Sequence, residues 1–97
     1  MRIPFVAGNF KMHKTVAEAV KYVKEFRVMV KDLQGIQIVL APPFTAIHAA
    51  AEAARNSNIE ISGQDVHWER QGAFTGEISA QMIREAGASC VIIVHSE

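Results

Sequence analysis

Four short apolar runs, rich in β-branched residues, alternate along the chain with longer stretches of helical periodicity. The runs cover residues 3–7, 36–40, 59–62 and 90–94, and each has the length and composition of a β-strand. The first and last runs are apolar almost throughout, which is typical of parallel strands that are buried on both faces. The run at 59–62 alternates more, so its burial is less certain from the pattern.

A long amphipathic helix is predicted between the first two strands. Thr15-Val16-Ala17-Glu18 has the form of a capping box, in which the Thr hydroxyl accepts from the Glu18 amide and Glu18 reaches back to the cap. Gly35 follows as a stop signal. Between the capping box and Gly35, apolar residues recur at spacings of three and four and can lie on a sheet. They are Val16, Ala19, Val20, Val23, Phe26 and Val30.

Two shorter helices are predicted in the remaining gaps. The second helix is expected to begin at a Thr45 N-cap and to run to about Arg55. The third is expected from Ser79 to Gly87. Its inward-facing residues are predicted to be Met82, Ile83 and Ala86.

The spacing of the strands indicates an α/β fold built from βαβ units. Strand starts at 3, 36, 59 and 90 are 33, 23 and 31 residues apart, which leaves room for right-handed helical crossovers. Four strands and three helices are just under half of a closed (β/α)8 barrel of about 250 residues. We interpret residues 1–97 as the N-terminal half of one barrel domain without an internal boundary. Alone, such a half would expose two apolar sheet edges.

Composition argues against several classes of partner and of site. Ten Lys and Arg residues balance ten Asp and Glu residues, so there is no electrostatic footprint for nucleic acid or an anionic membrane. The single cysteine, Cys90, cannot form an internal disulfide or a multi-thiolate metal site, and it fits a cytoplasmic location. His67-Trp68-Glu69 has the H-x-E form of zinc deaminases, but these enzymes also need a downstream P-C-x-x-C motif, and Cys90 is the only cysteine of the sequence.

Polar side chains cluster where the predicted strands end. In parallel α/β folds, sites form at the carboxyl ends of the strands, so these residues could converge on one small ligand. They are Asn9 and Lys11 after the first strand, Gln64 and Asp65 after the third, and His95, Ser96 and Glu97 after the fourth.

Three of these residues have chemistry suited to an anionic substrate. Lys11 supplies a positive charge for the substrate or for a developing oxyanion. His95 can donate to a carbonyl oxygen or shuttle a proton, and Glu97 could hold Lys11 in an ion pair. On spacing alone an alternative remains, in which Lys11 is a solvated loop residue, Glu97 begins a helix and His95 is a hydrogen-bonded strand-end histidine.

Four segments resemble the triosephosphate isomerase family, in that family's order and spacing, and together the resemblance covers all 97 residues. The segments are Gly8-Asn9-Phe10-Lys11-Met12, Ala41-Pro42-Pro43-Phe44, Gly72-Ala73-Phe74-Thr75-Gly76-Glu77-Ile78-Ser79 and His95-Ser96-Glu97.

The resemblance implies a TIM barrel that interconverts dihydroxyacetone phosphate and glyceraldehyde 3-phosphate through an enediolate, without cofactor or metal. It implies that Asn9 hydrogen-bonds the substrate and that Lys11 stabilises the substrate's negative charge. His95 would polarise the carbonyl and relay protons between the two oxygens, with Glu97 supporting Lys11. The family's carboxylate base falls beyond residue 97, so residues 1–97 alone are predicted to be inactive.

The resemblance also implies a homodimer with no nucleic-acid or membrane partner. In the family, the segment 65–79 is a long loop that inserts into a second subunit. Thr75, between Phe74 and Gly76, would reach the Asn9 and Lys11 region of that partner.

The sequence departs from the family pattern at two further positions. Val94 stands where the family usually has Gly before the His, which leaves the pose of His95 open, whereas Phe10 in place of Trp is expected to have little effect.

Two alternative functions are also compatible with the sequence. One alternative is a non-catalytic half-barrel that associates through its open sheet edges. Another is a different phosphosugar barrel enzyme, against which the 72–79 segment argues.

Overall fold

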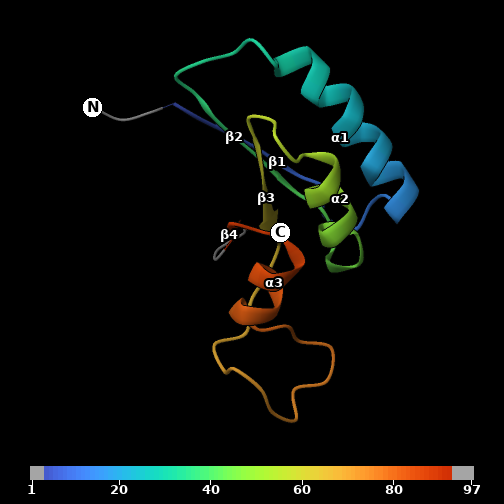
Figure 1. Ribbon diagram of the computed structural model, residues 1–97. Helices are drawn as coiled ribbons and strands as arrows, with labels where there is room; N and C mark the ends of the chain where they lie inside the picture. Colours follow the sequence, from blue (N-terminus) through green and yellow to red (C-terminus); the bar gives the residue numbers. More distant parts are fainter. Residues whose placement is uncertain (1–3, 93–97) are drawn as a thin grey trace.

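The computed structural model describes residues 4–92 and contains one parallel sheet whose strands follow chain order (Figure 1). The strands are β1 (Phe5–Asn9), β2 (Gln37–Ala41), β3 (Ile59–Gly63) and β4 (Cys90–Val91). The helices are α1 (Val16–Val30), α2 (Ile47–Ala53) and α3 (Ala80–Ala86), with the 3₁₀ turn η1 (Phe44–Ala46) before α2. The predicted alternation of strands and helices is therefore confirmed across the described residues.

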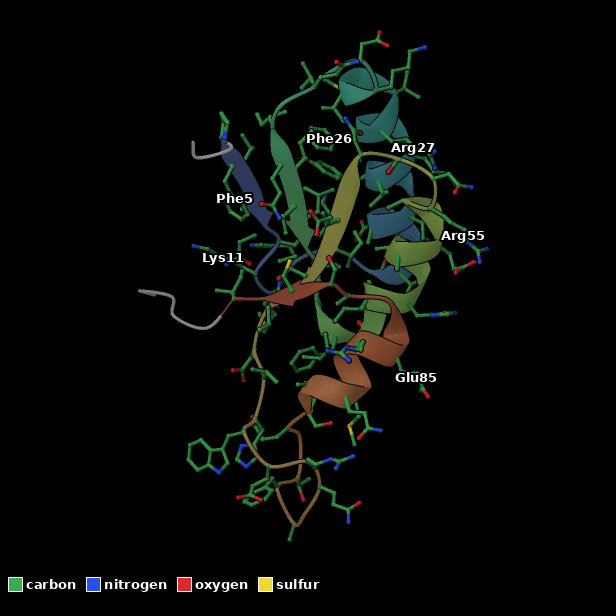
Figure 2. All side chains as sticks on the ribbon, turned by 60° about the vertical axis from the view of Figure 1, so that its left-hand side comes forward. Phe5, Lys11, Phe26, Arg27, Arg55 and Glu85 are labelled. Carbon is green, nitrogen blue, oxygen red and sulfur yellow. The ribbon has the colours of Figure 1, made fainter. Side chains whose placement is uncertain are left out.

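The sheet has a helix-covered face and an opposite face. Because successive strand residues point to opposite sides, the register separates the two sets of side chains. Figure 2 shows the helices on one side of the sheet, with Phe5 and Lys11 away from them. The buried cluster on the helix side includes Ile38, Leu40, Ile59, Ile61, Val23, Ile47, Ala50 and Ile83.

Local capping signals fix where two helices begin. The Thr15 hydroxyl accepts from the Glu18 amide at 3.3 Å, and the Glu18 carboxylate accepts from the Thr15 amide at 2.8 Å, which completes the predicted capping box. The hydrogen bond from the Thr15 backbone is the main reason that the pKa of Glu18 is lowered from its usual value. Ser79 likewise accepts from the Met82 amide at 3.2 Å and caps α3.

The second helix begins later than its sequence suggested. Thr45 is not its N-cap, because Phe44–Ala46 forms a 3₁₀ turn and α2 starts at Ile47. Pro43 is extended, at φ −57° and ψ 157°, and its carbonyl accepts from the Ala46 amide at 2.9 Å. The chain therefore turns tightly after the two prolines before an α-helix can form. The helix also ends at Ala53 rather than near Arg55.

Two predicted core positions are exposed. Met82 on α3 is 51% exposed, because its side of the helix lines a pocket beside the segment 65–79 rather than the sheet. Val16 is also exposed, at the first turn of α1, whereas Ala19, Val23 and Val30 are buried as predicted.

The first strand is much more exposed than the second and third strands. The prediction that the first strand is buried on both faces is wrong for the described residues, where Phe5 and Val6 are 58% and 49% exposed. Among residues 4–92, β1 pairs with β2 alone, so it lies at an edge of the sheet. β3 lies between β2 and β4 and contacts α2, and four of its five residues are buried. No helix within residues 4–92 is long and apolar enough to cross a membrane.

Candidate functional site

The carboxyl ends of three strands are joined by the side-chain amide of Gln64, which directly follows β3. Its Nε2 donates to the carbonyl of Ala41 at 2.9 Å and to the carbonyl of Lys11 at 2.8 Å. The same nitrogen lies 3.4 Å from Oδ1 of Asn9. The structure therefore brings Asn9, Lys11 and Gln64 together at the carboxyl ends of the strands, as the spacing predicted.

Asn9 and Lys11 form a turn that aims the lysine out of the strand. Oδ1 of Asn9 accepts from the Lys11 amide at 2.8 Å, which is the pattern of an Asx turn. Lys11 has a left-handed backbone, with φ of 54°. Its side chain is exposed on the side of the sheet away from the helices (Figure 2). An ammonium group held there can meet a negatively charged ligand at the strand ends.

The other predicted polar residues lie beside this site or outside the described residues. Asp65 follows Gln64 and is exposed. His95, Ser96 and Glu97 lie outside residues 4–92, as does Val94, so their placement stays a prediction. At Ile92 the chain still runs beside β3, since the Ile92 amide donates to the carbonyl of Gly63 at 2.9 Å.

The segment 65–79 forms a long excursion that projects from the rest of the structure (Figure 1). Its base is closed by the His67 amide, which donates to the carbonyl of Ile78 at 2.8 Å. Next to the base the Glu77 amide donates to the carbonyl of Phe74 at 2.9 Å, and Gly76 has a φ of 90°, so residues 74–77 form a turn. Thr75 lies in this turn and is exposed. The segment therefore has internal structure that presents Thr75 outward.

Aromatic contacts stiffen the same segment from inside. The rings of His67 and Phe74 have centroids 4.1 Å apart, and His67 stacks on Trp68 at 5.1 Å. A Cβ at Gly72 would lie 2.6 Å from the Phe74 ring, so this close approach requires glycine. Even so, Trp68 and Phe74 remain 87% and 43% exposed. Large apolar groups exposed together on a structured segment are a feature of interaction surfaces.

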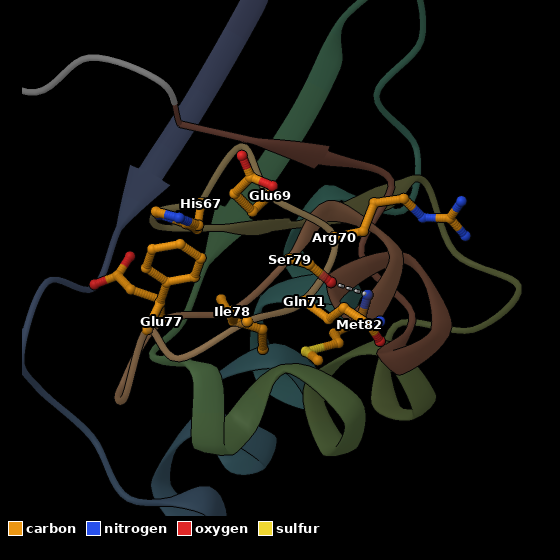
Figure 3. A pocket seen from close by; sticks show the side chains of 10 residues that line it. His67, Glu69, Arg70, Gln71, Glu77, Ile78, Ser79 and Met82 are labelled. Carbon is orange, nitrogen blue, oxygen red and sulfur yellow. Dashed lines mark hydrogen bonds between the residues drawn. The ribbon is translucent and has the colours of Figure 1, made fainter.

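A pocket of about 150 Å³ separates this segment from the start of α3 (Figure 3). The residues that line it come from the segment and from α3, so it is distinct from the strand-end site. They include His67, Glu69, Arg70, Phe74, Ser79 and Met82. Among residues 4–92, no group of three or more His, Cys, Asp or Glu side chains could hold a metal ion.

The sequence placed Gln64 among the strand-end polar residues but assigned it no role. A glutamine after a strand fits an exposed surface equally well, and only the folded structure shows that it reaches the carbonyl at the end of β2 and the carbonyl of Lys11 after β1. The signal was non-local, because Gln64 is 53 residues from Lys11 and 23 from Ala41.

Comparison with known proteins shows the family to which the chain belongs. A family model described as Triosephosphate isomerase matches residues 4–97. The chain belongs to the triosephosphate isomerase family. The triosephosphate isomerase of Pelobacter propionicus is 50% identical over 97 residues, and that of Trichlorobacter lovleyi is 46% identical. Each match covers the whole of this chain and 39% of the relative, so the chain spans about two fifths of the length of these family members.

A solved structure gives the same result for the fold. The triosephosphate isomerase from Bartonella henselae superposes with a TM-score of 0.89 at 37% sequence identity. The match covers 98% of this chain and 39% of that one. The family fold and the parallel sheet in chain order confirm the prediction that this segment is part of a TIM barrel.

The bridging role of Gln64 can be tested in a full-length chimera, in which residues 1–97 replace the matching segment of the Pelobacter propionicus relative. Gln64→Ala removes two hydrogen bonds, but the Lys11 carbonyl can bind water and the Ala41 carbonyl keeps the Phe10 amide, so the free energy of unfolding should fall by about 1–1.5 kcal/mol. Urea unfolding of the chimera measures it.

The matched control is Gln37→Ala, which removes an exposed amide whose contact is to Glu60 at 3.0 Å. This variant should change the free energy of unfolding by about 0.5 kcal/mol or less. Equal losses for the two variants would contradict a special role for Gln64.

Proposed function

We propose that this chain forms the N-terminal part of an enzyme that interconverts dihydroxyacetone phosphate and glyceraldehyde 3-phosphate in the cytoplasm. Family membership supports the reaction class. The observation that carries the proposal is the convergence of Asn9 and Lys11 at the strand ends, held by Gln64. A TIM barrel places its chemistry at this edge of the sheet.

Asn9 and Lys11 would act on the substrate from one turn. Oδ1 of Asn9 faces the Lys11 amide and Gln64, so its Nδ2 is the part that would donate to a substrate oxygen. The Lys11 ammonium would attract the substrate phosphate and offset the negative charge that grows on the enediolate oxygens. Because the turn fixes the start of the Lys11 side chain, this charge needs little reorganisation during the reaction.

His95 and Glu97 complete the proposed chemistry. An imidazole at the end of the fourth strand would polarise the substrate carbonyl and carry a proton between the two oxygens. Glu97 would hold Lys11 through an ion pair. The general base of the family matches no position within residues 1–97, so this segment by itself would not turn over substrate.

The segment 65–79 supports a homodimer. It projects from the sheet, it has its own hydrogen bonds, and it exposes Trp68 and Phe74. A second copy would cover these rings and place Thr75 near the Asn9 and Lys11 turn of its partner. The site of each subunit would then depend on the other subunit.

A non-catalytic half-barrel that self-associates is the second candidate, favoured by one observation. Phe5 and Val6 are exposed on β1, which in residues 4–92 pairs with β2 alone. An apolar edge strand, with one side open within the described residues, is a template for pairing with another chain.

The role of Lys11 is tested in the chimera by Lys11→Ala. Loss of the ammonium should lower kcat/KM by about 10²- to 10³-fold, because a preorganised charge at the reacting oxygens is lost. Lys31→Ala, at an exposed lysine after α1, is the control and should leave kcat/KM unchanged. Full turnover by Lys11→Ala would overturn the electrostatic role, and turnover of a different phosphosugar by the parent chimera would reassign the substrate.

The dimer is tested by Thr75→Arg in the chimera. A bulky cation in the turn of residues 74–77 should raise the dimer dissociation constant about 30-fold or more, as measured by analytical ultracentrifugation. Met29→Arg places the same side chain at a 78% exposed position on α1 and should leave the dimer intact. An unchanged dimer in Thr75→Arg would show that the segment 65–79 is not the interface.

The second candidate is tested on residues 1–97 alone. Sedimentation should show concentration-dependent self-association without isomerase activity. Val6→Lys, which places a charge on the exposed strand, should reduce the association. A well-folded monomer at all concentrations would refute association through the open edge.

A further inference from the structure

The turn between β1 and α1 contains two lysines with left-handed backbones. Lys11 has a φ of 54° and Lys14 has a φ of 79°. Side chains other than glycine rarely adopt this region, and they do so where the surroundings hold them there. The hydrogen bonds of Asn9 and Gln64 hold Lys11, whereas Lys14 requires a separate cause.

The Lys14 ammonium lies over two aromatic rings. Its Nζ is 5.1 Å from the ring centroid of Tyr22 and 5.9 Å from that of Phe10. Both distances are within the range of cation–π attraction. The two rings also contact each other edge to face, with centroids 5.1 Å apart and planes at 76°. One ammonium group is therefore shared by a pair of rings that already pack together.

Each of these rings is anchored to a different element. Phe10 is 8% exposed, and its amide donates to the carbonyl of Ala41 at the end of β2. Tyr22 lies on α1 and stacks on Phe26 with centroids 5.7 Å apart. Lys14 thus ties the end of the sheet to the helix, across the turn that contains Lys11.

We propose that Lys14 is a positioning residue for Lys11, holding the turn of residues 10–15 by its contact with the rings of Phe10 and Tyr22. The proposal rests on the proposed function, in which Lys11 meets the substrate. Lys14 does not contact the substrate in this proposal; it acts on Lys11 through the backbone of the turn. Without the contact, the backbone at Lys14 relaxes toward negative φ, and the residues before it, including Lys11, are reoriented.

Three substitutions in the chimera distinguish the effects that the charge of Lys14, its backbone conformation and the overall stability have on the KM. Lys14→Met keeps the length of the side chain but removes the charge, and it should lower kcat/KM about fivefold, chiefly through a higher KM. Lys14→Arg keeps a cation over the rings and should retain kcat/KM. Lys14→Gly loses the contact but relieves the strain of the left-handed backbone, and because these two effects on stability oppose each other, it should unfold within a few degrees of the parent chimera; the turn is no longer held by the rings, so the KM should still rise.

An NMR measurement keeps the test independent of catalysis. In the chimera labelled with ¹⁵N-lysine, Lys14→Met should shift the backbone amide signal of Lys11 and change its φ-sensitive coupling constant, whereas Lys14→Arg should not. Lys24→Met, which removes an exposed charge from α1, is the control and should leave the Lys11 signal in place.

The outcomes are distinct for the two proposals. An unchanged KM and an unchanged Lys11 signal in both Lys14→Met and Lys14→Gly would overturn the positioning role. A parent chimera without isomerase activity would overturn the proposed function, and the Lys11 amide signal would still decide whether Lys14 holds the turn.

Discussion

The candidate site depends on one side-chain amide that links the ends of two other strands by donating to a backbone carbonyl at each. Buried or partly buried carbonyls need donors, and a parallel sheet leaves such carbonyls at its carboxyl edge. Gln64 donates to Ala41 at the end of β2 and to Lys11 after β1, so the three strand ends form one surface. The left-handed backbone of Lys11 is a consequence, because it presents that residue's carbonyl to the amide and its own amide to Asn9.

One face of the sheet carries most of the hydrophobic core, and the other face carries the candidate site. The helix side carries the aliphatic cluster around Leu40, Ile61 and Ile47, where most of the apolar burial occurs. The opposite side ends in Asn9 and Gln64 and exposes Phe5 at the first strand. This asymmetry is expected of a segment of a barrel, in which the side of the sheet away from the helices faces other strands.

Local patterns in the sequence predicted most of the elements, and non-local contacts explain where the predictions were wrong. Thr15 and Ser79 cap their helices through residues three positions away, so their role can be read from the sequence. Thr45 has the right residue type for a cap, but it lies inside the 3₁₀ turn that follows Pro43. The exposure of Phe5 and Met82 and the bridge made by Gln64 depend on which strands and segments become neighbours, and periodicity does not contain that information. The roles of His95 and Glu97 remain predictions.

The central claim is that the Asn9–Lys11 turn and His95 face one hollow at the same edge of the barrel. A crystal structure of the chimera with a bound triose phosphate analogue tests it most directly. The structure should show the Lys11 ammonium and the His95 ring both in contact with that single ligand. A ligand that contacts neither residue, or a His95 ring at the opposite end of the barrel from Lys11, would contradict the claim.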